Sequence, residues 1–171
     1  MNATMNKRGF LSLMAVTALG AWALPAAAQS KRYDIDPASM PPEVRKVLEQ
    51  YLAVLRKSAD LDQCAERFVA VAGGSLVNED GKTLRGSVKP YGLKKDYNNI
   101  KFYADPAVIS RVAKLDPVTS GFGPSAIRGP RYKIWIDKKS GEAGRPAPVT
   151  ILVPEGHKTI RAPKVVNIGS F

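Results

Sequence analysis

Apolar residues recur at helical spacing along the chain between residues 41 and 103. Pro41 and Pro42 suit the first turn of a helix, where backbone N–H groups have no partner. Asp60, followed by Gln63, predicts the cap of a second helix, and Ser87 predicts the start of a third. The apolar positions of these three predicted helices are Val44, Val47, Leu48, Tyr51, Val54 and Leu55; Leu61, Cys64, Ala65, Phe68, Val69 and Ala72; and Tyr91, Leu93, Tyr97, Ile100 and Tyr103.

The pattern changes from helix to strand after Asp105-Pro106. Tyr132, Ile134 and Ile136 alternate with polar or amphipathic neighbours, as in a strand with one buried face. Strands are predicted over 108–115, 131–137, 149–153 and 160–171, and a long Gly- and Pro-rich loop over 116–130. Three helices followed by at least four strands predict an α+β domain, in which a curved antiparallel sheet wraps the helices and leaves a pocket between them.

The first 28 residues carry the pattern of a secretory signal peptide. Lys7 and Arg8 precede the apolar run 10–24, and the small residues 26–28 form a cleavage site. We expect cleavage after Ala28 and export to the periplasm or beyond. The run Lys7-Arg8-Gly9-Phe10-Leu11 resembles a variant twin-arginine motif, so the export route stays open. An apolar core of about 15 residues is too short to span a bilayer, and the mature protein is not expected to cross a membrane.

The remaining chain divides into a flexible N-terminal arm, residues 29–40, and a single domain, residues 41–171. Loss of Lys7 and Arg8 lowers the formal net charge from +11 to +9. A basic surface attracts anionic partners, and among exported proteins an anionic envelope component is a natural one. No basic stripe is interleaved with exposed aromatic residues, so nucleic acid is not a predicted partner.

The reactive side chains of the chain are few. Cys64 is the only cysteine, lies on the apolar face of a predicted helix, and is interpreted as a packing residue. His157 is the only histidine and lies in a predicted turn. A metal centre or a catalytic triad needs several converging ligands, so neither is predicted. No phosphate-binding glycine loop is present, and no cofactor is expected.

The block Val44 to Tyr103 carries a resemblance to a known family. Its features are Tyr51-Leu52-Ala53-Val54-Leu55 on the first helix, Asp60-Leu61-Asp62, a second helix through Phe68, the turn Asn78-Glu79-Asp80, and Leu84-Arg85-Gly86 before the third helix. This order resembles the nuclear transport factor 2-like superfamily (the SnoaL-like, cystatin-like cone). The resemblance implies a cone-shaped α+β fold, with three helices held in a curved antiparallel sheet.

Within that superfamily, the catalytic pattern most similar to this chain is that of ketosteroid isomerase. The resemblance implies that Tyr51 would donate to a developing oxyanion and that Asp80, or Glu79, would move a proton. The family also uses an uncharged aspartic acid on a late strand as a second hydrogen-bond donor to the oxyanion. The corresponding strand here, 149–153, contains no acid, which argues against isomerase chemistry.

The remaining aromatic residues predict the wall of a small-ligand pocket between helices and sheet. The members of this predicted wall are Phe68, Tyr97, Phe102, Tyr132 and Trp135. We therefore expect a non-catalytic domain that binds a small apolar ligand or an envelope partner. The alternatives are a cofactor-free isomerase or hydrolase that uses Tyr51 and Asp80, and a homodimer joined through the face of the sheet.

Overall fold

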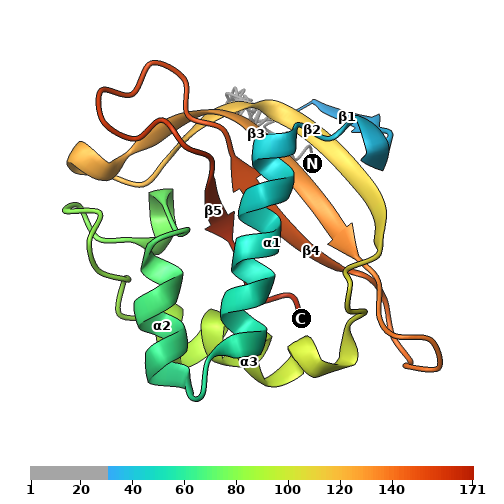
Figure 1. Ribbon diagram of the computed structural model, residues 1–171. Coiled ribbons are helices and arrows are strands. Elements are labelled where there is room, and N and C mark those ends of the chain that lie inside the picture. The colour runs from blue at the N-terminus through green and yellow to red at the C-terminus, as the bar shows by residue number, and fades with distance from the viewer. Residues whose placement is uncertain (1–30) are drawn as a thin grey trace, which may run out of the picture.

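The computed structural model describes residues 31–171, which form an α+β domain with three α-helices and one curved antiparallel sheet (Figure 1). The signal-peptide prediction for residues 1–28 lies outside the described residues. The helices are α1 (Pro42–Lys57), α2 (Leu61–Val69) and α3 (Lys94–Asn99). The strands are β1 (Arg32–Ile35), β2 (Ile109–Ser120), β3 (Ile127–Ile136), β4 (Ala147–Leu152) and β5 (Lys164–Asn167).

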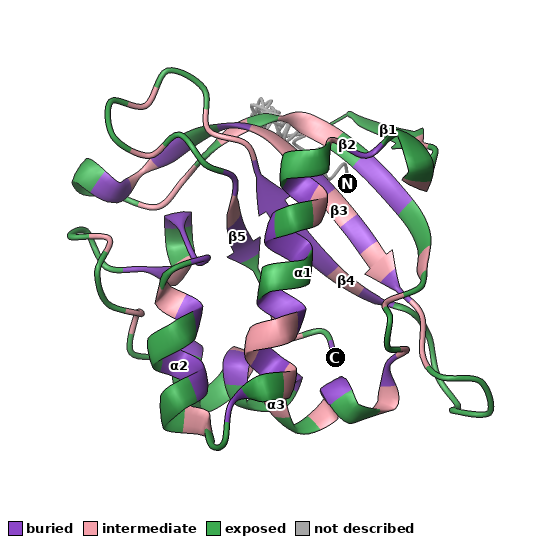
Figure 2. Ribbon diagram, in the orientation of Figure 1, coloured by how far each residue is buried: buried purple, intermediate pink, exposed green. Residues whose placement is uncertain are grey.

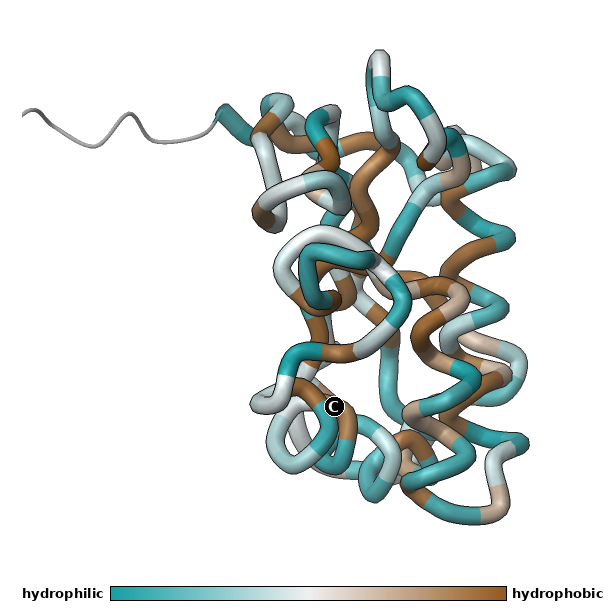
Figure 3. The backbone as a smooth tube through the Cα atoms, turned by 90° about the vertical axis from the view of Figure 1, so that its left-hand side faces the viewer, coloured by the Kyte–Doolittle hydropathy of each residue, from teal (hydrophilic) through white to brown (hydrophobic). Residues whose placement is uncertain are grey.

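The first two helices begin where the sequence predicts. Pro41 is the N-cap of α1, and the side chain of Asp60 caps α2 by accepting a hydrogen bond from Gln63 N at 2.8 Å. The Gln63 side chain in turn accepts from Ala59 N at 2.9 Å, one residue before the position of a standard capping box. Hydrophobic positions recur between hydrophilic ones at each turn of the helices (Figure 3). Each helix therefore presents one apolar side to the core.

The third predicted helix consists of three consecutive helical segments of different types. A π-helical stretch, Val88–Leu93, leads into α3, and a short 3-10 helix, Ile100–Phe102, follows it. The Ser87 side chain makes no capping bond. Pro90 lacks an N–H and Gly92 is a poor helix former, so both weaken regular α-helical geometry at its start.

The five strands are joined in sequence order, each antiparallel to the next. The helices cover one face of the sheet, and the core lies between this inner face and α1 (Figure 2). The predicted alternation in β3 is confirmed, because Tyr132, Ile134 and Ile136 are buried on the inner face. Trp135 therefore points to the opposite, outer face.

Residues 31–40 are not an irregular arm. Arg32–Ile35 forms β1, which pairs with residues 112–115 of β2, and Pro37–Ser39 is a short 3-10 helix. Asp34 contributes to this placement because it forms an ion pair with Arg111 of β2. The structure thus has a strand and a short helix where the sequence predicted an arm, because the stabilising contacts come from a strand far along the chain.

Several strand boundaries also differ from the prediction. The predicted loop 116–130 is mostly strand: β2 continues to Ser120 and β3 begins at Ile127. A register irregularity between Leu115 and Val118 accommodates Pro117, which cannot donate to a regular ladder. The last strand is shorter than predicted, with β5 confined to Lys164–Asn167.

Among the described residues, no helix is both long and apolar enough to cross a membrane.

Candidate functional site

The predicted interior pocket is filled around Tyr51. The Tyr51 side chain has no exposed surface, and its hydroxyl donates to Asp96 Oδ2 at 2.6 Å. Its ring centroid lies 5.2 Å from that of Phe68 and 6.3 Å from that of Phe171. Phe171 also meets Tyr103 edge-on at 4.6 Å. These packed rings occupy the space between helices and sheet in which the sequence predicted a ligand.

Asp96 is a buried hydrogen-bond acceptor that sequence reasoning missed. Besides the Tyr51 hydroxyl, its carboxylate accepts from Gly169 N at 2.7 Å and Phe171 N at 2.9 Å. It thereby joins α1 and α3 to the segment after β5. An acid between Leu93 and Ile100 on the apolar stripe was the available signal, because a buried acid needs such partners.

Burial has the largest effect on the pKa values of this pair. It raises the pKa of Asp96, although the hydrogen bonds from Tyr51, Gly169 and Phe171 act in the opposite direction. Burial, and next the nearby Asp96, raise the pKa of Tyr51 well above its usual value. Tyr51 is therefore held as a neutral donor to Asp96, which is a structural role in this geometry.

The shifted pKa of Asp96 predicts a distinct pH dependence of stability. A carboxyl group whose pKa is raised on folding stabilises most below its unfolded value, near 3.8, and this contribution is lost as pH rises through the folded value. Asp96→Asn removes the titration. We expect the free energy of unfolding of the native chain, relative to that variant, to fall between about pH 3 and about pH 7 in urea titrations. If the native chain instead gained stability relative to Asp96→Asn as the pH rises over this range, the pKa of Asp96 would not be raised on folding.

Asp80, the proposed proton carrier, lies in an exposed turn. Its Oδ1 accepts from Lys82 N at 2.8 Å, within the connection that the isolated bridge Val77–Leu84 closes. The neighbouring Glu79 is also exposed and lies against Gly123. The hydroxyl of Tyr51 has Asp96, not either of these acids, as its partner. The structure therefore does not bring the two candidate catalytic residues into one site.

The five predicted ligand-binding aromatics do not share a cavity. Phe68 and Tyr132 are buried in the core, and the Tyr97 hydroxyl donates to Ser58 O at 3.3 Å. Phe102 is half-buried at the edge of the domain, beneath Lys101 and Lys138. Trp135 is separated from the others by the thickness of the sheet. Of the five, Trp135 is the one that lies on the outer face of the sheet, which the helices do not cover.

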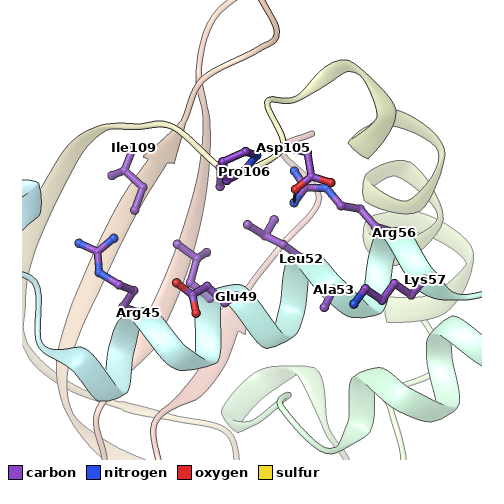
Figure 4. A pocket seen from close by; sticks show the side chains of 11 residues that line it. Arg45, Glu49, Leu52, Ala53, Arg56, Lys57, Asp105, Pro106 and Ile109 are labelled. Atoms are coloured by element: carbon purple, nitrogen blue, oxygen red, sulfur yellow. Dashed lines mark hydrogen bonds and ion pairs between the residues drawn. The ribbon is translucent and has the colours of Figure 1, made fainter.

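One pocket, the α1 groove, lies between α1 and the segment 105–109 (Figure 4). It has a volume of about 510 Å³ and carries charges of both signs. Arg56 pairs with Asp105 at 3.0 Å and donates to Ala104 O, while Arg45 donates to Pro37 O at 2.8 Å. Both arginines are thus engaged in joining α1 to its neighbours, which makes the groove a poorer anion site than its composition indicates.

Three cationic groups surround Trp135 on the outer face of the sheet. Arg32 lies 4.7 Å, Arg111 5.1 Å and Lys133 5.2 Å from the ring centroid. Asp34 accepts from Arg111 at 2.6 and 3.1 Å, and these bonds lower the pKa of its carboxyl group. Arg32 and Arg111 are therefore paired within the protein, whereas Lys133 extends the cluster toward a neighbouring pocket.

This second pocket, the sheet pocket, opens on the outer face and has a volume of about 590 Å³. Its lining contains two basic residues and no acid. The polar members are Ser75, Thr119, Ser120, Arg131, Lys133, Thr150 and Asn167, and the others are Leu115, Val118, Gly121, Phe122 and Val166. A pocket of this size with cations, hydroxyls and an amide, and without a carboxylate, suits a small anionic ligand.

The wall of the sheet pocket is fixed by a contact between distant segments. Ser75 N donates to Ser120 Oγ at 3.1 Å, and the backbone of Gly121 packs directly on that of Gly74. A Cβ on Gly121 would lie 2.8 Å from the Gly74 carbonyl, so a larger residue does not fit. The β2–β3 connection is therefore held beside β5 and encloses the outer face.

The fold and this site define an α+β domain with a curved sheet and a cationic pocket on the face opposite its helices. Comparison of the chain with protein-family models, with curated proteins and with solved structures found no match. The resemblance to the nuclear transport factor 2-like superfamily stays a prediction.

Proposed function

We propose that this chain is an exported, non-catalytic binding domain that takes a small anionic ligand in the sheet pocket. The observation that carries the proposal is the combination of Arg131 and Lys133 in a lining without a carboxylate. Its proposed partner in the cell is an anionic small molecule of the envelope, in line with the basic charge of the chain.

The site is better suited to binding than to catalysis. The sheet pocket offers donors that hold an anion, but its lining has no histidine, cysteine or carboxylate to act as a general base or nucleophile. Tyr51, the donor of the isomerase alternative, is committed to Asp96 inside the core. Binding is therefore favoured over the isomerase or hydrolase alternative that would use Tyr51 and Asp80.

The proposal is tested with matched charged and neutral probes. In calorimetric titrations of the full chain, we expect hexanoate and hexyl phosphate to bind and hexanamide and hexanol to bind at least about tenfold more weakly, because charge-assisted hydrogen bonds contribute about 1.5–3 kcal/mol. Lys133→Gln is expected to weaken anion binding by about tenfold.

Lys114→Gln is the matched control. Lys114 is an exposed lysine of β2 that pairs with Tyr132 and is absent from the pocket lining. Lys114→Gln removes a single positive charge from the same sheet, as Lys133→Gln does. We expect Lys114→Gln to have little effect on the affinity for the anionic probes. Equal binding of the neutral probes, or an equal loss in both lysine variants, would contradict the proposed site.

A further inference from the structure

An exposed aromatic residue stands at the rim of the sheet pocket. Phe122 is 61% exposed, although a phenylalanine is usually buried. It lies between Gly121 and Gly123, both with positive φ, in the connection that packs against Gly74. The guanidinium of Arg85 lies 4.9 Å from the ring centroid. The backbone thus fixes an apolar side chain at the opening of a cationic pocket.

Apolar lining continues from this rim into the pocket. Val118 and Val166 line the pocket and also pack in a second hydrophobic cluster with Ile127 and Leu152. Leu115 adds a further apolar side chain from β2. A simple inorganic anion would leave this apolar surface in contact with water, and an attached hydrocarbon group would cover it.

Both charged residues of the lining come from β3, and a hydroxyl of β4 lies beside them. Arg131 and Lys133 project from β3, and Thr150 pairs with Lys133 across the sheet. Thr150 is buried, and so is the Nε atom of Arg131. A guanidinium, an ammonium and a hydroxyl on neighbouring positions suit the oxygens of one anionic head group.

We infer that the ligand is an acidic single-chain amphiphile. Its phosphate or carboxylate head lies at Arg131 and Lys133, and its hydrocarbon chain lies along Val118 and Val166 toward Phe122. This inference rests on the proposed function, because it names the class of anion that the sheet pocket takes.

Chain-length series of alkyl phosphates and alkyl carboxylates test the inference. Calorimetric titrations of the full chain with ethyl, butyl, hexyl and octyl members, below their micellar concentrations, measure affinity per added CH₂. We expect each CH₂ to tighten binding by about twofold to fourfold in at least one series, as burial of hydrocarbon predicts. The series whose members bind with higher affinity shows whether the preferred head group is a phosphate or a carboxylate.

Lengthening the ligand from butyl to octyl should increase its affinity for the native chain. Phe122→Ser is expected to make this increase in affinity at least about threefold smaller and to leave the affinity for ethyl phosphate unchanged. Tyr91→Ser is the control, since Tyr91 is 74% exposed and lines a different surface pocket beside α3. Affinity that is independent of chain length in both series would overturn the amphiphile and leave anion binding intact. Failure of all charged members to bind would overturn the proposed function as well.

Discussion

Replacing Gly129 by alanine is expected to lower the free energy of unfolding by about 3 kcal/mol or more, which places it at the upper end of overpacking effects. A Cβ at Gly129 would lie 1.8 Å from the carbonyl oxygen of Val153, so the backbone of β3 or of the segment after β4 must move. Two backbone bonds flank this contact, Val153 N to Pro130 O at 3.0 Å and Glu155 N to Arg128 O at 2.7 Å. Urea unfolding followed by circular dichroism measures the loss.

Gly86→Ala is the matched control for this prediction. Nothing lies within 4 Å of a Cβ built on Gly86, and its φ is not positive. We expect a change within about 0.5 kcal/mol, because the substitution meets no neighbour. If Gly129→Ala were as mild as Gly86→Ala, the close approach of β3 to Val153 would be wrong.

Replacing Asp96 by alanine is expected to lower the free energy of unfolding by about 3 kcal/mol or more. The substitution removes the acceptor of three donors, Tyr51 Oη, Gly169 N and Phe171 N, and each buried donor left without a partner costs about 1–3 kcal/mol. The same urea titrations measure this effect. Near-native stability would show that Asp96 does not anchor the segment after β5.

Asp80→Ala is the control for Asp96→Ala, because it also removes an acid, but an exposed one. Asp80 is exposed and accepts a single bond, from Lys82 N. We expect its replacement to cost about 1 kcal/mol or less. A larger effect for Asp80 than for Asp96 would reverse the roles that the structure assigns to the two acids.

The local parts of the fold could be predicted from the sequence. Pro42 and the apolar stripe define α1, the Asp60 side chain caps α2, and the alternation around Ile134 identifies β3, because each depends on neighbours within a few residues. Pro117 and the nearby glycines indicated a loop, but pairing with β3 extends β2 past Pro117 to Ser120. Such long-range pairing overrides local propensity.

The site depends on contacts that no local pattern contains. The sheet pocket requires Gly74 to meet Gly121 and Ser75 to meet Ser120, across a large separation in sequence. Trp135 was predicted to line a pocket, yet the register of β3 turns it to the outer face. The aromatic residues could be recognised as important, but the face of the sheet on which each lies required the structure.

The most direct test of the account is the location of the bound ligand. In ¹H–¹⁵N spectra of the full chain titrated with octyl phosphate, we expect the largest shift changes at amides of the sheet pocket, including Arg131, Lys133 and Asn167. Amides around Tyr51 and along the α1 groove should change little. Largest changes at those positions, with the sheet pocket unaffected, would contradict the central claim that ligand binding occurs on the face opposite the helices.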